Sequence, residues 1–311
     1  MPLPHADTPV GRSPRRCVTT ATPSLDRIAL PSGRLAMVAL DQRESLATML
    51  RAHGADDSRP ALTSFKLDLV RALAPLASAV LIDSEYGYRE VVDQAMLPPS
   101  CGLILAADAL TQERGGPVTE TEIDTSVDPD AARADGAVAL KLLVIWRADA
   151  LREHRVALAD RFVSLCRSAG LLSVLEPVAQ PVPGRESEFD LNAAILDAAA
   201  ALAPLRPDVY KAQVPSGGRG PMGELVAACQ RLDALVPVPW VVLSNGVTPD
   251  DFPRAVEAAC RGGASGMLAG RAVWTSVLGA PDHHAAVAGA ADRLRLLIDI
   301  VTEHGRDWRD R

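Results

Sequence analysis

The sequence of 311 residues lacks the patterns typical of disulfide scaffolds, membrane proteins and nucleic-acid-binding proteins. Its five cysteines are widely spaced, odd in number and without a CxxC pair, which indicates reduced thiols and a cytoplasmic location. No apolar run reaches the roughly 18 uncharged residues that a transmembrane helix needs. The net charge of −7 provides no basic field for nucleic acid or acidic membranes, so we expect neither as a partner.

The chain also lacks a long linker and the glycine-rich turn that usually follows the first strand of a doubly wound sheet, where Asp41-Gln42-Arg43 stands instead. Short apolar segments alternate with amphipathic ones, which is typical of a parallel sheet covered by helices. We predict strands at 35–41, 79–84, 103–107, 137–145, 172–177, 208–214, 240–245 and 264–269. We predict helices at 43–53, 63–74, 130–134, 151–169, 191–202, 223–235, 249–261 and 282–303.

Eight such repeats predict a single-domain α/β protein with a (β/α)₈ TIM barrel over 27–311. Residues 1–26 carry arginine, proline and threonine without an apolar stretch, and we expect a loosely ordered N-terminal tail there. The acidic stretch 119–135 is interpreted as a solvated loop followed by a short helix.

A lysine lies inside the predicted strand 208–214. Alternation places Val209, Lys211 and Gln213 on one face of this strand. Burial disfavours the charged form of an amine, and a neutral amine can attack a ketone to form an imine. On this segment alone, a lysine on an edge strand that extends its amine into water remains an alternative.

Further ionisable residues follow the other predicted strands, at the end of a barrel where catalytic groups lie. Lys141 would disfavour a second positive charge on Lys211, while Glu176 and Asp41 supply counter-charge and proton transfer. Asp83, Glu85 and Asp108 also stand at strand ends. The alternative is a buried ion-pair network that only holds the strands in place.

The last two predicted strands end in small residues and one arginine, which predicts an anion site. These residues are Ser244, Asn245, Gly246, Gly270 and Arg271. The alternative is that the glycines only form tight turns. None of the six histidines follows a predicted strand and no HExxH occurs, so we expect neither a metal ion nor another cofactor.

Several of these segments, taken in order, resemble the class I tagatose-1,6-bisphosphate aldolase family, and within it the sulfofructosephosphate aldolases. The matching segments are 40–43, 142–147, 172–177, 208–211 and 264–274. The resemblance implies that Lys211 forms the Schiff base and that Asp41, Lys141 and Glu176 assist dehydration and proton transfer. It also implies that Ser244, Gly246, Gly270 and Arg271 hold the substrate phosphate, with Gln42 and Arg43 near the other end of the substrate; Asn245 departs from the family pattern, where a second serine is common.

The expected activity is reversible cleavage of 6-deoxy-6-sulfofructose 1-phosphate, a step of sulfoquinovose degradation, to dihydroxyacetone phosphate and 3-sulfolactaldehyde. Tagatose 1,6-bisphosphate is the alternative substrate. A barrel that binds a sugar phosphate without catalysis is an alternative of another class. We also expect a homo-oligomer, with the predicted helix 282–303 at the contact.

Overall fold

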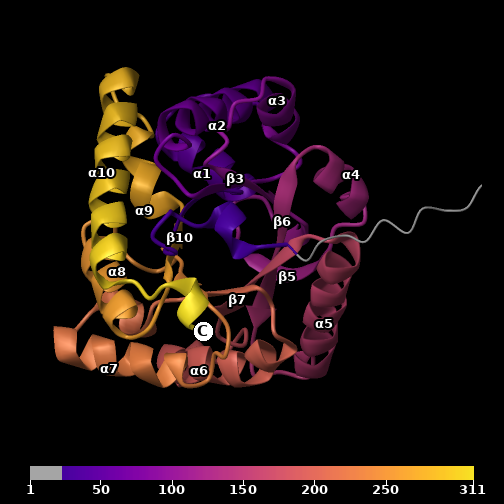
Figure 1. Ribbon diagram of the computed structural model, residues 1–311, viewed down its shortest axis with the longest axis vertical. Helices are drawn as coiled ribbons and strands as arrows, with labels where there is room; N and C mark the ends of the chain where they lie inside the picture. Colours follow the sequence, from indigo (N-terminus) through magenta and orange to yellow (C-terminus); the bar gives the residue numbers. More distant parts are fainter. Residues whose placement is uncertain (1–22) are drawn as a thin grey trace, which may run out of the picture.

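The computed structural model describes residues 23–311, and its centre is a closed barrel of parallel strands (Figure 1). The order around the barrel is β1-β10-β9-β8-β7-β6-β3-β2. The strands are β1 (Leu35–Leu40), β2 (Ala79–Ile82), β3 (Gly102–Ala106), β6 (Ala137–Trp146), β7 (Leu172–Ala179), β8 (Val209–Ala212), β9 (Trp240–Val242) and β10 (Gly266–Ala269). The predicted TIM barrel and its eight strands are confirmed.

Helices surround the barrel, with α10 running along one side (Figure 1). They are α1 (Glu44–Ala52), α2 (Arg59–Leu73), α3 (Tyr88–Asp93), α4 (Pro129–Ala134), α5 (Arg152–Ala169), α6 (Leu191–Leu202), α7 (Met222–Asp233), α8 (Phe252–Arg261), α9 (Arg271–Trp274) and α10 (His283–His304). The short helices α3 and α9 were not predicted. None of the helices in residues 23–311 combines the length and apolar character that a bilayer crossing needs.

Alternation along each strand divides the apolar side chains between two cores. Val209 packs in the cluster inside the barrel, whereas Tyr210 and Ala212 pack in the cluster between the strands and the helices. The same period directs the later residues of several strands into the barrel above its apolar floor. The face predicted for Lys211 is therefore the inner one.

A short 3₁₀ helix, Leu25–Ile28, closes the amino-terminal end of the barrel. Ile28 is fully buried and joins the interior cluster together with Leu25. Residues 1–22 of the predicted tail 1–26 lie outside the described residues. Leu25, near the end of that tail, takes part in this packing. Asp26 also forms an ion pair with Arg309 near the carboxyl terminus.

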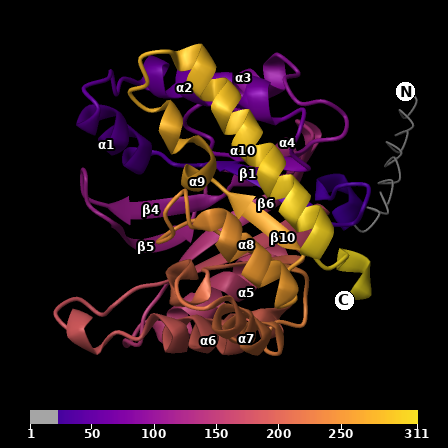
Figure 2. The same cartoon turned by 90° about the vertical axis from the view of Figure 1, so that its left-hand side faces the viewer.

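An antiparallel hairpin stands between β3 and β6, made of β4 (Asp108–Gln112) and β5 (Val118–Ile123). Figure 2 shows it projecting from the barrel beneath α1. The prediction of a loop at the start of the acidic stretch 119–135 was therefore wrong, while α4 confirms its short helix. Exposed residues alternate with less exposed ones along β4, which fits a hairpin that faces solvent on one side.

Candidate active site

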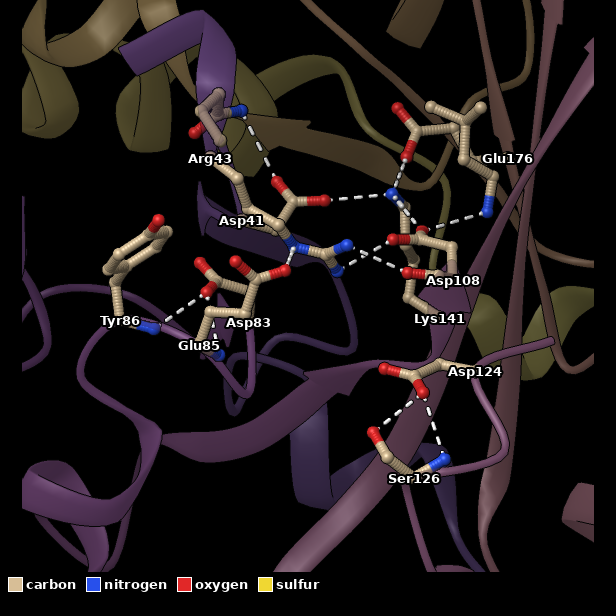
Figure 3. Close-up of polar contacts among 12 residues, drawn as sticks. Asp41, Arg43, Asp83, Glu85, Tyr86, Asp108, Asp124, Ser126, Lys141 and Glu176 are labelled. Atoms are coloured by element: carbon tan, nitrogen blue, oxygen red, sulfur yellow. Dashed lines mark hydrogen bonds and ion pairs between the residues drawn. The ribbon is translucent and has the colours of Figure 1, made fainter. Parts of the chain in front are cut away.

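The ammonium group of Lys141 lies at the centre of three carboxylates. Its Nζ is 2.8 Å from Asp41 Oδ2, 2.8 Å from Asp108 Oδ2 and 2.8 Å from Glu176 Oε2. Figure 3 shows these carboxylates turned toward Lys141 from separate segments of the barrel. Lys141 is 2% exposed, so a charge at this place needs such partners.

Glu176 connects Lys141 to Lys211. Its Oε1 lies 2.8 Å from Lys211 Nζ, while its other oxygen faces Lys141. Lys211 is 3% exposed and comes from β8, the neighbour of the strand that carries Glu176. The four residues expected to carry the chemistry, Asp41, Lys141, Glu176 and Lys211, are therefore brought together.

Attraction between these opposite charges shifts the pKa values of Lys141 and Asp41 further than burial shifts them the other way. Burial alone would lower the pKa of Lys141, but the carboxylates of Asp108, Asp41 and Glu176 raise it well above its ordinary value. Burial alone would raise the pKa of Asp41, but the charges of Lys141 and Lys211 lower it below its ordinary value. At neutral pH Lys141 therefore carries a positive charge and Asp41 a negative one.

The residues predicted to hold phosphate lie at the ends of β9 and β10. Ser244, Gly246 and Arg271 border one hollow of about 270 Å³. Arg271 Nη2 donates a hydrogen bond to Asn245 Oδ1. Gly246 has φ +81°, which a side chain would strain, and a Cβ at Gly270 would lie 2.9 Å from the carbonyl oxygen of Ala39.

The mouth of the barrel is a cavity of about 360 Å³ that contains both ends of the predicted site. Asp41, Lys141, Glu176 and Arg271 all line it. The β4–β5 hairpin supplies one wall through Leu110, Gln112 and residues 115–118. Lys211 is not among the lining residues and reaches the cavity wall through its contact with Glu176.

Gln42 and Arg43 line the same cavity, but their polar groups face protein partners. Gln42 Nε2 donates to Asp41 Oδ1 at 3.2 Å. Arg43 donates from Nη1 to the Asp108 carbonyl oxygen at 2.8 Å and from Nη2 to Asp108 Oδ1 at 2.9 Å. Arg43 therefore lies beside the ionic cluster around Lys141.

Two residues of the cluster were not assigned a role from the sequence. Asp108 contacts both Lys141 and Arg43, and Lys66 of α2 forms a fully buried ion pair with Asp83. Burial lowers the pKa of Lys66 despite this pair. The sequence offered a signal, since the whole chain has only three lysines, and all three are buried in or next to this cluster.

The arrangement contains groups that imine chemistry uses. Within residues 23–311 no cluster of three or more His, Cys, Asp or Glu side chains suits a metal ion. The three carboxylates at the mouth surround the Lys141 ammonium instead. A buried amine, a carboxylate in contact with it and a nearby anion site are the parts that a Schiff-base reaction on a phosphorylated ketone requires.

Comparison with known proteins gives a consistent result. A model of the DeoC/LacD family aldolases matches residues 35–276. The tagatose 1,6-diphosphate aldolase of Listeria monocytogenes is 26% identical over 274 residues, with 80% of each chain covered. Tagatose 1,6-diphosphate aldolase 1 of Streptococcus pyogenes is 27% identical, covering 78% of this chain and 81% of that protein.

A solved structure of fructose-bisphosphate aldolase from Plasmodium falciparum has the same fold. The TM-score is 0.68 at 11% identity, and the match covers 90% of this chain and 93% of that one. At such identity the likeness concerns the fold alone. It agrees with the closed barrel described above.

Proposed function

This chain belongs to the DeoC/LacD family of class I aldolases, which are carbon–carbon lyases, and we propose that it cleaves a ketose 1-phosphate through an imine on Lys211. The observation that carries the proposal is the pair of contacts made by Glu176, with one oxygen 2.8 Å from Lys211 Nζ and the other 2.8 Å from Lys141 Nζ. One carboxylate thus contacts both the nucleophile, from which it can take a proton, and a cation that stabilises its ionised form.

The proposed reaction begins when the Lys211 amine, having lost its proton to Glu176, attacks C2 of the ketose. Glu176 then gives this proton to the hydroxyl of the carbinolamine, and Asp41 and Lys141 assist its loss as water, which leaves the iminium and the Glu176 carboxylate. Glu176, with Asp41, next takes the C4 hydroxyl proton, the C3–C4 bond breaks, the aldehyde half is released, and the electron pair of the broken bond moves into the enamine. Protonation and hydrolysis of the enamine release dihydroxyacetone phosphate and regenerate the amine.

The phosphate of this product is proposed to bind at the ends of β9 and β10. Arg271 borders both the mouth and the neighbouring hollow, so a phosphate there would lie beside the reacting carbons. Ser244 and the backbone at Gly246 and Gly270 would donate the remaining hydrogen bonds. Asn245 holds the guanidinium of Arg271.

The resemblance of the sequence to sulfofructosephosphate aldolases makes 6-deoxy-6-sulfofructose 1-phosphate the first candidate substrate, as in sulfoquinovose degradation. The names of the relatives support tagatose 1,6-bisphosphate as the second. The two substrates differ at C6, where a sulfonate carries one negative charge and a phosphate up to two. A homo-oligomer in the cytoplasm, with α10 at the contact, is part of the same proposal.

Turnover of purified protein with the two candidates and with fructose 1,6-bisphosphate tests the proposal. We expect kcat/KM to be highest for the sulfonated ketose, and Lys211→Arg to reduce cleavage of every substrate by at least about 10³-fold, since a guanidinium forms no imine. Cleavage by Lys211→Arg at the wild-type rate would contradict the assignment of the nucleophile. A higher kcat/KM for tagatose 1,6-bisphosphate would make it the preferred substrate in place of the sulfonated ketose.

A further inference from the structure

Arg43 lines the mouth of the barrel, yet its guanidinium is occupied by protein groups. Two of its nitrogens donate to the carbonyl and the carboxylate of Asp108, at 2.8 and 2.9 Å. The third, Nε, makes no hydrogen bond and lies 3.6 Å from the carboxylate of Glu85, within ion-pair distance. Arg43 is 8% exposed, so an anion that entered the cavity would have to displace these partners to reach the guanidinium.

Asp108 transmits this contact to Lys141. Its Oδ1 accepts from Arg43, and its Oδ2 accepts from Lys141 Nζ at 2.8 Å and from the Leu143 backbone at 3.1 Å. Figure 3 shows the Asp108 carboxylate between the guanidinium of Arg43 and the ammonium of Lys141. The fork of Arg43 thus fixes the carboxylate that holds Lys141 in its place between Asp41 and Glu176.

The ion pairs of the cations that line the cavity also distinguish Arg43 from Arg271. In residues 23–311, three cations line the mouth, and Arg43 and Lys141 both form ion pairs with carboxylates. Arg271 instead donates to the neutral amide of Asn245. The cation with charge left for a substrate anion is therefore Arg271, which follows β10.

We propose that Arg43 is a positioning residue, which acts on the imine chemistry through Asp108 and Lys141 instead of binding an anion at the C6 end of the substrate. The inference rests on the proposed function, because it concerns the groups around Lys211. It replaces the substrate contact that sequence resemblance implied for Arg43.

Exchange of the C3 hydrogen of dihydroxyacetone phosphate in deuterated water separates the two roles. This half-reaction needs the imine and the enamine, but its substrate has no C6 end. A positioning role predicts that Arg43→Gln slows exchange about 10- to 100-fold, because small displacements of catalytic groups cost rates of this size. A role in binding the C6 anion predicts unchanged exchange, and that result would overturn the proposal.

The full reaction provides a second measurement. With tagatose 1-phosphate and tagatose 1,6-bisphosphate, Arg43→Gln should lower kcat by a similar factor for both and change KM less than about threefold. A loss confined to the bisphosphate and expressed in KM would contradict a positioning role. Arg43→Lys retains the charge but not the fork, and should slow exchange at least about tenfold; wild-type exchange in this variant would overturn the proposal.

The link through Asp108 is tested by a double-mutant cycle on the exchange rate. Asp108→Asn should slow exchange, and combining it with Arg43→Gln should slow it no further than the more severe single variant, because the two residues act as a unit. Independent, multiplying losses would contradict the link. A wild-type protein that neither exchanges nor forms a reducible adduct with dihydroxyacetone phosphate would instead refute the proposed function.

Arg155 offers a matched control for loss of a buried arginine. It is 1% exposed, pairs with Asp149 and Glu120, and does not line the mouth. Arg155→Gln should leave the exchange rate within about threefold of wild type while lowering the thermal midpoint. Equal slowing in this variant would show that any such loss disturbs the site, and would overturn the specific role of Arg43.

Discussion

Glu176 shows how a barrel can keep several charges in its interior. A buried ammonium or carboxylate is costly alone, and it is tolerated here because each member of the cluster contacts at least one group of opposite charge. Among residues 23–311, Lys211 has one such partner and Lys141 has three. This difference suits their proposed roles, since the nucleophile must lose its proton and Lys141 must retain its own.

The lowered pKa of Asp41 leads to a prediction about stability and pH. Its folded-state pKa is below the unfolded value of about 3.9, so its stabilising contribution is present above that value and is lost as the pH falls. The free energy of unfolding should therefore fall from about pH 5 downward, and less steeply in Asp41→Asn. Urea unfolding between pH 3 and pH 7 measures both slopes; equal slopes would contradict the assignment.

At this scale the sequence predicted which residues face inward but not how they pair. Strand alternation and position placed Asp41, Lys141, Glu176 and Lys211 at one end of the barrel; the first three line the mouth, and Lys211 contacts Glu176 beneath it. The pairing of Arg43 with Asp108 depends on how a turn after β1 meets the first residue of β4. No local pattern contains that information.

Among the elements, closure of the barrel depends on the contact between β1 and β10. Leu35 pairs with Gly266, where a Cβ would lie 1.9 Å from the Leu35 carbonyl oxygen and the backbone has φ +146°. A side chain at this position would force the two strands apart. Only glycine allows the first and the last strand to approach this closely.

Gly266→Ala should therefore lower the free energy of unfolding by about 1–3 kcal/mol or more. Gly289→Ala in α10 is the matched control, because no atom lies within 4 Å of the added methyl group. There we expect a gain of up to about 1 kcal/mol from helix propensity. Chemical denaturation of both variants checks the contrast, and similar changes in both would refute the argument from strand contact.

The elements that the sequence predicted best are those with strong apolar periodicity. Each barrel strand is buried on both faces, and its short apolar run is distinctive. The β4–β5 hairpin was missed because β5, Val118–Ile123, alternates acidic and polar residues that also suit a loop. The short helix α9, Arg271–Trp274, is set by the turn at Gly270 and has too few residues for a periodic signal.

On the scale of the whole molecule, the two ends of the barrel differ in the side chains that fill them. The 3₁₀ helix Leu25–Ile28 packs apolar side chains against the interior at one end. Ionic groups occupy the other end, where they meet the cavity. Stability and chemistry are thus separated along the barrel axis, as is general for this fold.

The distribution of lysine gives the whole chain a useful property. Lys66, Lys141 and Lys211 are its only lysines, and all three are at most 3% exposed. Apart from the amino terminus, a reductive reaction with a ketone therefore has three primary amines to modify. A covalent adduct can be assigned to one of them from peptide masses.

The most direct test of the central claim is mass spectrometry after incubation of the protein with dihydroxyacetone phosphate and sodium borohydride. The account predicts one adduct per chain, located on Lys211, and none in Lys211→Ala. An adduct on Lys66 or Lys141, or an unmodified wild-type protein that still cleaves its substrate, would contradict it.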